Sequence, residues 1–432
     1  MKSCVYIQSA LYLAPDEVRT CCQRFFVRGK IKGDVSLNIR HENGELTYDD
    51  VVAAKQKLVE DINNGTDDRC DGCPYLVDDD WKPIEDEAIN YLSIEHHSVC
   101  NMKCTYCSET YYGGLKPQFD LVEFAKSFEK VSPDLHIAWG GGEPTALKNF
   151  EETFSFVQDR FQPKTQRVFT NALKYSPAIQ KALDDRRISI TTSIDAGNPA
   201  TFKYVRKSAG FKKVLDHLKL YSEHSPENVT IKYIFTEDNF AKSEIDGFLH
   251  EIDARDLHRC SFLLSTDYKA EKKVFDYLDN IVYLYFMLTE RGAGSISMDD
   301  HIFNRLRGKG FKLWDKQDPA NDDVAHMREK VKIVLERFSG SDVILWGTGE
   351  FAKKLLGNPG FRRNFNVIKI VDPDERRVGT EFQGMKVLPV STVQRESTNI
   401  VIGSVNFFGE IVNRLKHMQV EQTRVVPSFL VY

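Results

Sequence analysis

Short apolar runs alternate with amphipathic stretches through the middle of the chain. The runs contain many β-branched residues and end in turn residues, which is typical of strands. They are Ile89–Ile94, Leu135–Trp139, Arg167–Thr170, Ile188–Ile194, Val229–Phe235 and Ser261–Leu264. The stretches between them, such as Phe150–Phe161 and Phe211–Tyr221, repeat apolar residues at helical spacing. This alternation predicts an α/β fold with a parallel sheet, here a partial (βα)6 barrel of the TIM type, in which the carboxyl ends of the strands carry the chemistry.

The pattern changes on both sides of this region. The amino-terminal part is rich in polar turns and has one helical stretch, near Tyr48–Ile62. The part after the barrel is predicted to be a mostly helical connector with a loop near Gly292–Ser297, and a new strand–turn–helix pattern follows the boundary near Ser339–Ser341. We therefore predict four parts, namely 1–87, 88–267, 268–340 and 341–432.

Composition narrows the class of protein. A length of 432 residues predicts two or three domains, and ordinary apolar content with mixed charge predicts a globular chain. The net charge of −5 gives no electrostatic argument for binding nucleic acid. No segment has the length of a membrane span, and the amino terminus lacks the apolar core of a signal peptide. We expect a cytoplasmic protein whose partners include neither nucleic acid nor a membrane.

The nine cysteines are unevenly placed, and three of them lie on one loop after the first predicted strand. Thiols stay reduced in the cytoplasm, so clustered cysteines indicate metal ligands. Cys100, Cys104 and Cys107 have spacings that can hold three irons of a 4Fe–4S cluster and leave the fourth iron open. An open metal position is where a substrate binds. The alternatives are a structural cluster or a zinc site with His96 or His97 as the fourth ligand.

A second motif, Trp-Gly-Gly-Gly-Glu-Pro-Thr at residues 139–145, ends the next predicted strand. Together with the CxxxCxxC loop, in which an aromatic residue precedes the third cysteine, it resembles the radical S-adenosylmethionine (SAM) superfamily. The resemblance implies that the three cysteines hold the catalytic cluster. It also implies that the glycines let the backbone approach the methionine part of SAM, and that the glutamate helps to hold its ammonium group. The implied cofactor-binding residues in these motifs are Tyr106, Gly141, Gly142, Glu143 and Pro144.

Weaker matches follow at the ends of the later predicted strands. Asn171 ends the third strand, Ser193 and Asp195 end the fourth, and Arg206 lies in the segment Tyr204–Ser208 that follows. In the superfamily such positions carry polar or basic residues that contact SAM. The resemblance therefore adds these four residues to the predicted cofactor site.

The resemblance implies a specific chemistry. The reduced cluster would pass one electron to the sulfonium of SAM, giving methionine and a 5′-deoxyadenosyl radical that removes hydrogen from a substrate. A flavodoxin or ferredoxin is the expected electron donor. The substrate is expected to be a peptide or a small molecule, such as a sugar or nucleotide-linked metabolite. The reaction type stays open among oxidation, cross-linking, epimerisation and methylation.

The amino-terminal part has a second set of cysteines. This set resembles the auxiliary-cluster modules called SPASM or twitch domains, although those usually follow the barrel. The resemblance implies an auxiliary 4Fe–4S cluster held by Cys4, Cys22, Cys70 and Cys73, with Cys21 as a substitute for Cys22. A structural zinc site or no metal are the alternatives. The ninth cysteine, Cys260, is expected to be a buried, inert thiol.

The last part begins with an apolar strand, a glycine turn and a helix. The turn has the pattern G-x-G-x-x-A at Gly347 and Gly349, and a second predicted strand, Val367–Val371, ends in Asp372. Such an acidic residue takes a ribose hydroxyl in dinucleotide-binding folds. We predict a Rossmann-like domain with a nucleotide or NAD bound at these three residues. The segment also resembles Rossmann-like domains of polysaccharide and nucleotide-sugar enzymes. A domain that docks a partner or shapes the substrate site is the alternative.

Three hypotheses for the function follow. The first is a radical SAM enzyme with an auxiliary cluster. The second is an NAD-dependent oxidoreductase with structural metal sites, which would need a catalytic acid or base in the short last domain. The third is a non-catalytic iron–sulfur protein, for which the glycine–glutamate motif would have no role. We favour the first because both motifs then have a function.

Overall fold

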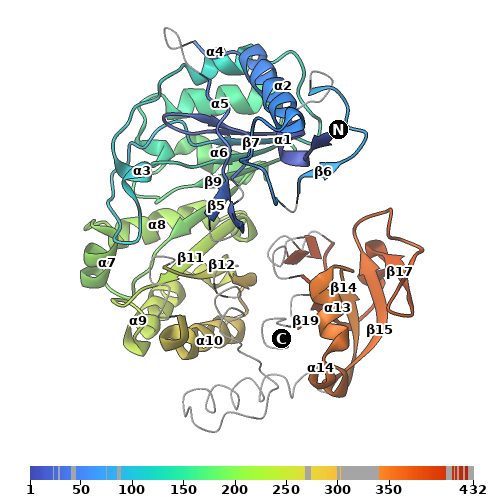
Figure 1. Ribbon diagram of the computed structural model, residues 1–432. Helices are drawn as coiled ribbons and strands as arrows, with labels where there is room; N and C mark the ends of the chain where they lie inside the picture. Colours follow the sequence, from blue (N-terminus) through green and yellow to red (C-terminus); the bar gives the residue numbers. More distant parts are fainter. Residues whose placement is uncertain are drawn as a thin grey trace. The chain divides into compact units, whose positions relative to one another are not determined.

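The computed structural model describes most of the chain, namely residues 1–22, 24–27, 30–39, 45–73, 75–84, 89–267, 274–298, 302, 340–404, 411–412, 414–415, 418–421 and 424–426 (Figure 1). These residues form two compact units. The first comprises Met1–Ile231 and His250–Leu257, and the second comprises Lys232–Leu249 and His258–Tyr432. None of the helices in the described residues is long and apolar enough to cross a membrane.

A mostly parallel sheet organises the first unit. Its strand order is β10 (Ser189–Ser193), β9 (Thr165–Phe169), β8 (His136–Trp139), β7 (Tyr91–Ile94), β2 (Ala10–Leu13) and β3 (Val18–Arg19). All neighbours from β10 to β2 pair in parallel, and β3 is antiparallel to β2. The parallel α/β sheet predicted from the sequence is confirmed. Strand β2 was not expected, because its partner β7 lies far along the chain.

Helices of the first unit begin and end at residues that favour these positions. They are α1 (Val5–Ser9), α2 (Tyr48–Asn64), α3 (Glu109–Tyr112), α4 (Leu121–Lys126), α5 (Phe150–Phe161), α6 (Pro177–Asp184), α7 (Pro199–Arg206) and α8 (Phe211–Ser222). Helix α2 begins with a capping box between Thr47 and Asp50 and ends at Gly65, which is left-handed. Helices α6 and α7 have proline in the first turn, after Ser176 and Asn198 as N-caps.

Two short antiparallel pairs complete the first unit. Strand β1 (Lys2–Ser3) pairs with β6 (Val77–Asp78), and β4 (Arg24–Val27) pairs with β5 (Lys30–Gly33). The first pair holds the beginning of the chain against the segment that follows α2. It therefore brings the segment that carries Cys4 beside the segment that follows Cys70 and Cys73.

Strand β11 (Val229–Phe235) begins in the first unit and ends in the second, whereas helix α9 (Lys242–Asp253) begins in the second unit and ends in the first. In the second unit the order continues as β13 (Ser295–Met298), β12 (Ser261–Thr266) and β11, and helix α10 (Val274–Glu290) precedes β13. The predicted loop near Gly292–Ser297 is wrong at its end. The residues of β13 pair in parallel with β12, and the Ser295 hydroxyl donates to that of Ser261 at 2.9 Å. Serines on this strand concealed its β pattern.

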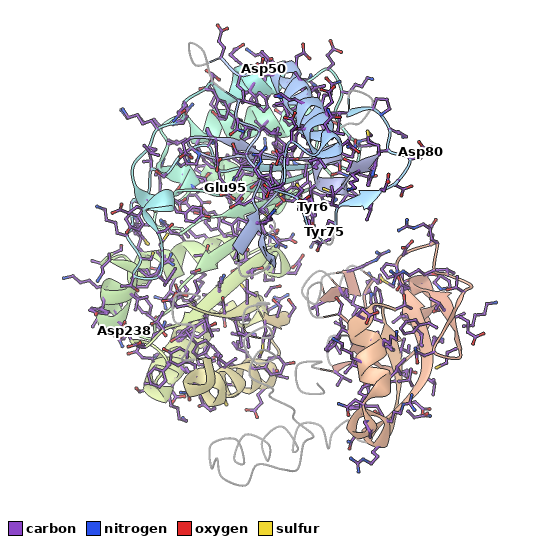
Figure 2. All side chains as sticks on the ribbon, in the orientation of Figure 1. Tyr6, Asp50, Tyr75, Asp80, Glu95 and Asp238 are labelled. Atoms are coloured by element: carbon purple, nitrogen blue, oxygen red, sulfur yellow. The ribbon has the colours of Figure 1, made fainter. Side chains whose placement is uncertain are left out.

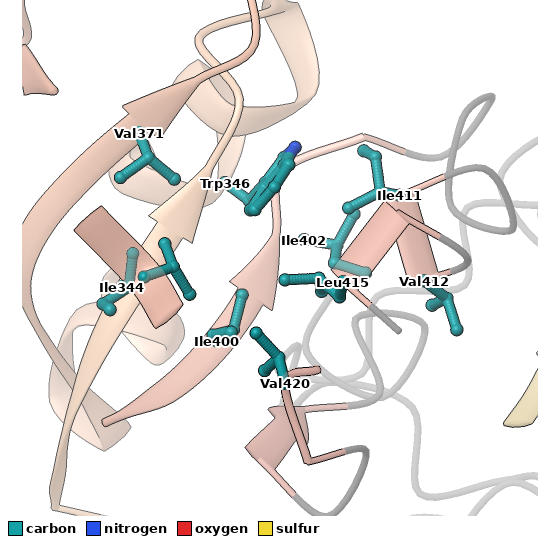
Figure 3. Close-up of a cluster of buried hydrophobic side chains, with 10 residues drawn as sticks. Ile344, Trp346, Val371, Ile400, Ile402, Ile411, Val412, Leu415 and Val420 are labelled. Atoms are coloured by element: carbon teal, nitrogen blue, oxygen red, sulfur yellow. The ribbon is translucent and has the colours of Figure 1, made fainter. Parts of the chain in front are cut away.

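The rest of the second unit holds a separate sheet. Its order is β16 (Glu381–Phe382), β17 (Met385–Pro389), β15 (Phe365–Asp372), β14 (Ser341–Trp346), β18 (Asn399–Ile402) and β19 (Val425–Val426), all parallel except β16. Helices α13 (Glu350–Gly357) and α14 (Pro359–Asn364) join β14 to β15. Figure 3 shows part of its core, where Ile344, Trp346 and Ile402 pack with Leu415. The parallel strands agree with the α/β pattern predicted here, while the Rossmann-like assignment stays a prediction.

The predicted boundaries at residues 87, 267 and 340 also stay predictions. Within the segment 1–87, strand β2 pairs with β7 of the predicted barrel. Within the predicted helical connector the structure describes residues 274–298, 302 and 340, and helix α10 accounts for most of them. The remaining residues of the connector lie outside the described part.

Candidate functional site

The three-cysteine loop follows β7, at the carboxyl end of the parallel strands. Cys100, Cys104 and Cys107 are all half-buried and form no disulfide. Two backbone contacts shape the loop, because the amide of Cys107 donates to the carbonyl of Cys104 at 3.0 Å and the amide of Thr105 donates to the carbonyl of Val205 at 2.9 Å. The second contact ties the loop to helix α7. The three thiols therefore lie on a loop whose backbone is fixed by hydrogen bonds.

The glycine turn after β8 packs directly against this loop. The amide of Gly142 donates to the carbonyl of His97 at 2.9 Å, and that of Glu143 donates to the carbonyl of Val99 at 2.8 Å. A Cβ atom at Gly142 would lie 2.2 Å from the Val99 oxygen, and Gly141 has a φ of +82°. Only glycine fits such a close backbone approach. The structure shows that these glycines admit the cysteine loop, while their predicted contact with SAM stays a prediction.

Glu143 is buried and joins the ends of β8 and β9. Its Oε1 accepts from the Thr145 amide at 3.1 Å, the Thr145 hydroxyl at 2.7 Å and the Thr170 hydroxyl at 2.8 Å, and its Oε2 accepts from the Asn171 amide at 2.6 Å. Burial raises the pKa of Glu143, and these hydrogen bonds act in the opposite direction. Pro144 follows as the first residue of a short 3-10 helix, Pro144–Ala146, that Glu143 caps. Sequence reasoning missed Thr145 and Thr170, whose signal was only a hydroxyl beside each motif.

Asn171 brings the third strand end to the cysteine loop. Its Nδ2 donates to Oδ1 of Asn101 at 2.6 Å and lies 4.0 Å from Sγ of Cys100. Its Oδ1 accepts from the amide of Leu173 at 3.0 Å, which fixes the orientation of the amide group. The side chain is buried. The predicted Asn171 therefore does lie beside a predicted cluster ligand.

Tyr106, Asp195 and Arg206 form a buried network beneath the loop. The Tyr106 hydroxyl donates to Oδ2 of Asp195 at 2.6 Å, and Nη1 of Arg206 donates to the same oxygen at 3.0 Å and to the Tyr106 hydroxyl. Asp195 has a φ of +57°, which aspartate tolerates better than most residues. Ser193, also predicted for this site, ends β10 and is half-buried. The structure thus joins three of the four weaker sequence matches to the cysteine loop.

Arg206 has donor capacity that the network leaves unused. Its Nε is buried and has no hydrogen-bond partner among the residues that the structure describes. The carbonyl oxygen of Arg206 lies 4.0 Å from Sγ of Cys104. Burial raises the pKa of Cys100 to about 11, and the positive charge of the Arg206 guanidinium acts in the opposite direction with a smaller effect. A buried cationic donor beside three thiols fits an anionic group there.

Neither histidine next to the loop is placed as a fourth metal ligand. Nδ1 of His97 accepts from the amide of Val99 at 3.2 Å, and His96 packs against Phe119. Burial lowers the pKa of His96 to about 3 and that of His97 to about 4. In the described part of the chain, no group of three or more His, Cys, Asp or Glu side chains is arranged around one metal ion. In a 4Fe–4S cluster each thiolate binds a different iron, so its ligands need not converge on one point.

The amino-terminal cysteines form a second group. Burial raises the pKa of Cys70 to about 12, and the nearby thiols of Cys21, Cys4 and Cys73 raise it further. The pKa of Cys22 is also raised, mainly by burial and then by Cys21 among other neighbours, while its hydrogen bond with Tyr12 lowers the pKa. The structure therefore groups Cys4, Cys70 and Cys73 with Cys21, the residue predicted as the substitute for Cys22.

The glycine turn of the last part is closed by its own aspartate. Gly347 has a φ of +103°, and Gly349 caps helix α13. Oδ2 of Asp372 accepts from the amide of Thr348 at 2.9 Å and from its hydroxyl at 2.6 Å, and Oδ1 accepts from the amide of Asp374 at 2.9 Å. Both carboxylate oxygens therefore have partners within the turn. Nucleotide binding by Gly347, Gly349 and Asp372 stays a prediction.

Comparison with known proteins identifies the class. Residues 94–244 match the family model described as the radical SAM superfamily. This part of the chain therefore matches the superfamily that the two motifs resemble, and enzymatic activity of the whole chain stays a proposal. The family implies a 4Fe–4S cluster and SAM as cofactors. Residues 340–426 match a second family model, described as C2185-like, N-terminal.

Individual relatives share only part of the chain. A GTP 3′,8-cyclase of Photorhabdus laumondii is 25% identical over 172 residues, which cover 38% of this chain and 51% of the relative. Molybdenum cofactor biosynthesis protein 1 of Bos taurus is 28% identical over 151 residues, or 32% of this chain and 23% of the relative. The chain spans about half the length of the cyclases it matches.

Solved structures show a distant likeness. The anSMEcpe structure with bound AdoMet and Cp18Cys peptide has 19% sequence identity and a TM-score of 0.39, covering 48% of this chain and 62% of that chain. Streptococcus suis SuiB bound to S-adenosylmethionine has 15% identity and a TM-score of 0.39, covering 62% of this chain and 66% of that chain.

Proposed function

We propose that this chain cleaves SAM at a 4Fe–4S cluster held by Cys100, Cys104 and Cys107 and uses the resulting radical to take hydrogen from a substrate. The observation that carries the proposal is the three-thiol loop itself. It is held against the glycine turn by two backbone hydrogen bonds and against α7 by a third. When bound, the cluster supplies the electron that breaks a carbon–sulfur bond of SAM.

The residues around the loop fit a bound amino-acid moiety. The buried Nε of Arg206 has a free donor that suits a carboxylate. Asn171, beside Cys100, offers a polar amide at the same end of the sheet. Tyr106 and Asp195 hold the guanidinium of Arg206 from the other side, so they act as positioning residues. Glu143 holds the ends of two strands together and so fixes the turn that meets the loop.

Arg206 also has an electrostatic role in this proposal. Three thiolates and a cluster place negative charge in a partly dry site, where charge is costly unless it is compensated. The charge of Arg206 favours the thiolate of Cys100, as the direction of its effect on the Cys100 pKa shows. The same charge favours binding of the anionic end of SAM.

The proposed substrate is a peptide or a small molecule such as a sugar or nucleotide-linked metabolite. The sequence likeness to GTP 3′,8-cyclases supports a nucleotide. That likeness covers 38% of this chain, so the other segments are free to select a different substrate. Incubation of the reduced enzyme and SAM with GTP, and separately with a peptide library, tests the two classes. Product formation from GTP alone supports the nucleotide, and modification of peptides alone contradicts it.

The test of SAM cleavage is direct. Protein reconstituted with iron and sulfide without oxygen, then reduced with dithionite in place of a flavodoxin or ferredoxin, is expected to release 5′-deoxyadenosine and methionine from SAM. The Cys100→Ala variant is expected to lose at least a hundredfold in this release. Cys260→Ala is the matched control, because Cys260 is buried, forms no disulfide and lies outside the three-cysteine loop. Wild-type protein that holds only zinc and releases no 5′-deoxyadenosine would support the NAD-dependent or non-catalytic alternatives.

A further inference from the structure

We propose that Cys4, Cys21, Cys70 and Cys73 form a second iron–sulfur centre that is closed by four protein thiolates, with the ammonium group of Lys55 as its buried counter-charge. This centre goes beyond the proposed function, because SAM cleavage at the three-cysteine loop does not require it. Cys22, although adjacent to Cys21, is not a ligand in this proposal.

Three segments bring the four cysteines together. Cys4 caps helix α1, and its Sγ accepts from the amide of Ile7 at 3.4 Å. The hydroxyl of Thr20 donates to the carbonyl of Tyr6 at 3.0 Å, which holds the segment of Cys21 against that helix. The third segment is a turn closed by the amide of Cys73, which donates to the carbonyl of Cys70 at 3.0 Å.

An aromatic pair joins the first and third segments. The rings of Tyr6 and Tyr75 meet edge to face with their centroids 5.3 Å apart. Both residues are labelled in Figure 2. The antiparallel pair of β1 and β6 joins the same two segments, with Ser3 opposite Val77. These contacts are made by residues next to the cysteines in the chain. They hold the two segments together without any contact between the thiols themselves.

The four thiols lie in one largely buried group. Cys4, Cys21 and Cys70 are buried and Cys73 is half-buried. Cys4 and Cys70 interact electrostatically with each other, and both interact with Cys21 and with Cys73. All four are free thiols, so no disulfide explains the grouping. Clustered thiolates that share no disulfide are the ligands of iron–sulfur and zinc centres.

The buried ammonium group of Lys55 is an independent indication that this site binds a negatively charged group. It lies on α2 with 1% of its surface exposed, and its Nζ donates to the carbonyl of Ala10 at 2.8 Å and to that of Gln8 at 3.4 Å. None of the ion pairs in the described residues includes it. Lysine is almost never fully buried unless it is paired with a negative group. The thiolate of Cys4 interacts favourably with it, and a four-thiolate cluster would supply the counter-charge.

Four thiolate ligands suit a 4Fe–4S cluster as well as a zinc ion, and the iron and zinc contents measured below distinguish the two. A 4Fe–4S cluster distributes its four ligands over four irons, and four thiolates leave none of the irons open. The second centre therefore does not bind SAM.

The position of the group separates it from the three-cysteine loop. The Nζ of Lys55 bonds the carbonyl of Ala10, the first residue of β2, and Ala10 is opposite Tyr91, the first residue of β7. The three-cysteine loop instead follows the last residue of β7 and contacts the turn after β8. The two sites thus lie at opposite ends of the parallel strands, and the second centre carries electrons or holds the amino-terminal segment without touching the SAM site.

The test starts from the variant Cys100→Ala/Cys104→Ala/Cys107→Ala, which lacks the first site. After reconstitution with iron and sulfide it is expected to hold about four irons per chain. Its electron paramagnetic resonance spectrum after reduction with dithionite is expected to stay the same when SAM is added. A chain with about one zinc and no iron, or a spectrum that SAM changes, would overturn the proposal.

Ligand choice is tested in the same background. Adding Cys21→Ala or Cys73→Ala is expected to remove nearly all of the iron, whereas adding Cys22→Ala is expected to leave it unchanged. Cys73 is half-buried, so its variant is the less disruptive of the two, and circular dichroism checks that each variant is folded. Loss of iron with Cys22→Ala and its retention with Cys21→Ala would contradict the ligand set.

Lys55→Gln tests the counter-charge. Removal of a positive charge disfavours the reduced, more negative cluster, so the reduction potential of the second centre is expected to fall while the iron content is retained. An unchanged potential would show that Lys55 does not compensate the cluster. Release of 5′-deoxyadenosine by the wild-type chain is measured separately, so failure of the first site and failure of the second are distinguishable.

Discussion

Asp195 and Arg206 form a buried ion pair, in which Nη1 of the arginine lies 3.0 Å from Oδ2 of the aspartate. Tyr106, one residue before a predicted cluster ligand, donates to the same carboxylate oxygen. Three separate parts of the radical SAM domain are therefore connected through one oxygen atom. The stability of this network and the placement of the cysteine loop are coupled.

Asp195→Asn is expected to lower the free energy of unfolding by about 3 kcal/mol, because Arg206 would keep a buried charge without its partner. Thermal or urea unfolding measures the loss. Asp134→Asn is the matched control, since the ion pair of Asp134 with Lys164 is exposed and such pairs contribute at most about 1 kcal/mol. Equal effects of the two substitutions would show that the buried network adds no stability.

Gly142→Ala is expected to reduce the iron bound at the three-cysteine loop and to slow 5′-deoxyadenosine release at least tenfold. The new methyl group would lie 2.2 Å from the backbone oxygen of Val99, so the loop must move. Gly140→Ala serves as the control, because the nearest atom to its Cβ would be a side-chain carbon of Glu95 at 3.6 Å. The iron content and the rate of 5′-deoxyadenosine release are measured for both variants. Equal values for the two variants would contradict the packing argument.

Acid is expected to destabilise the chain in part through His96. Burial lowers its pKa to about 3 in the folded chain, with smaller effects from His97 and Asp120, whereas an unfolded histidine titrates near 6.5. The unfolded state therefore binds more protons below pH 6.5, and stability falls as the pH falls from there towards 3. At pH 5.5 the effect amounts to about 1.4 kcal/mol relative to pH 7.5.

The measurement compares unfolding at these two pH values for the wild type and His96→Gln. The variant is expected to lose less stability between pH 7.5 and pH 5.5 than the wild type does. An identical loss in both proteins would assign the acid sensitivity to other groups.

Asp372→Ala is expected to lower the stability of the last domain by about 2 kcal/mol, because hydrogen bonds to a charged group contribute more than neutral ones. Two amides and one hydroxyl of the turn would lose their acceptor. Calorimetric titration with NAD, before and after the substitution, tests the predicted ribose contact. Binding that the substitution leaves unchanged would remove Asp372 from the predicted nucleotide site.

Sequence patterns located most elements of this fold because apolar periodicity is a local property. Helix α5 and strand β11 have the bounds that the pattern predicted. Strand β2 was missed, since its identity as a strand depends on pairing with β7. The serines of β13 hid it for a related reason, because its partner β12 rather than its own composition makes it a strand.

The site was predictable where a motif constrains both chemistry and spacing, as at the three cysteines and at Glu143. The partners of Glu143 were not, because Thr145 and Thr170 are ordinary residues until the fold brings them to one carboxylate. Cys21 and Cys22 are indistinguishable by spacing. The proposed choice of Cys21 therefore depends on the folded chain, in which Cys21 is buried and interacts with Cys4 and Cys70.

The backbone hydrogen bonds between the glycine turn and the cysteine loop involve no side chain and no metal. Because the backbone itself makes these bonds, we expect the loop to keep its conformation whether or not the thiols bind iron, and to lose little conformational freedom on binding it. A chain that has lost its cluster to oxygen is therefore expected to keep this loop conformation. Supplying iron and sulfide would then restore the cluster without refolding the protein.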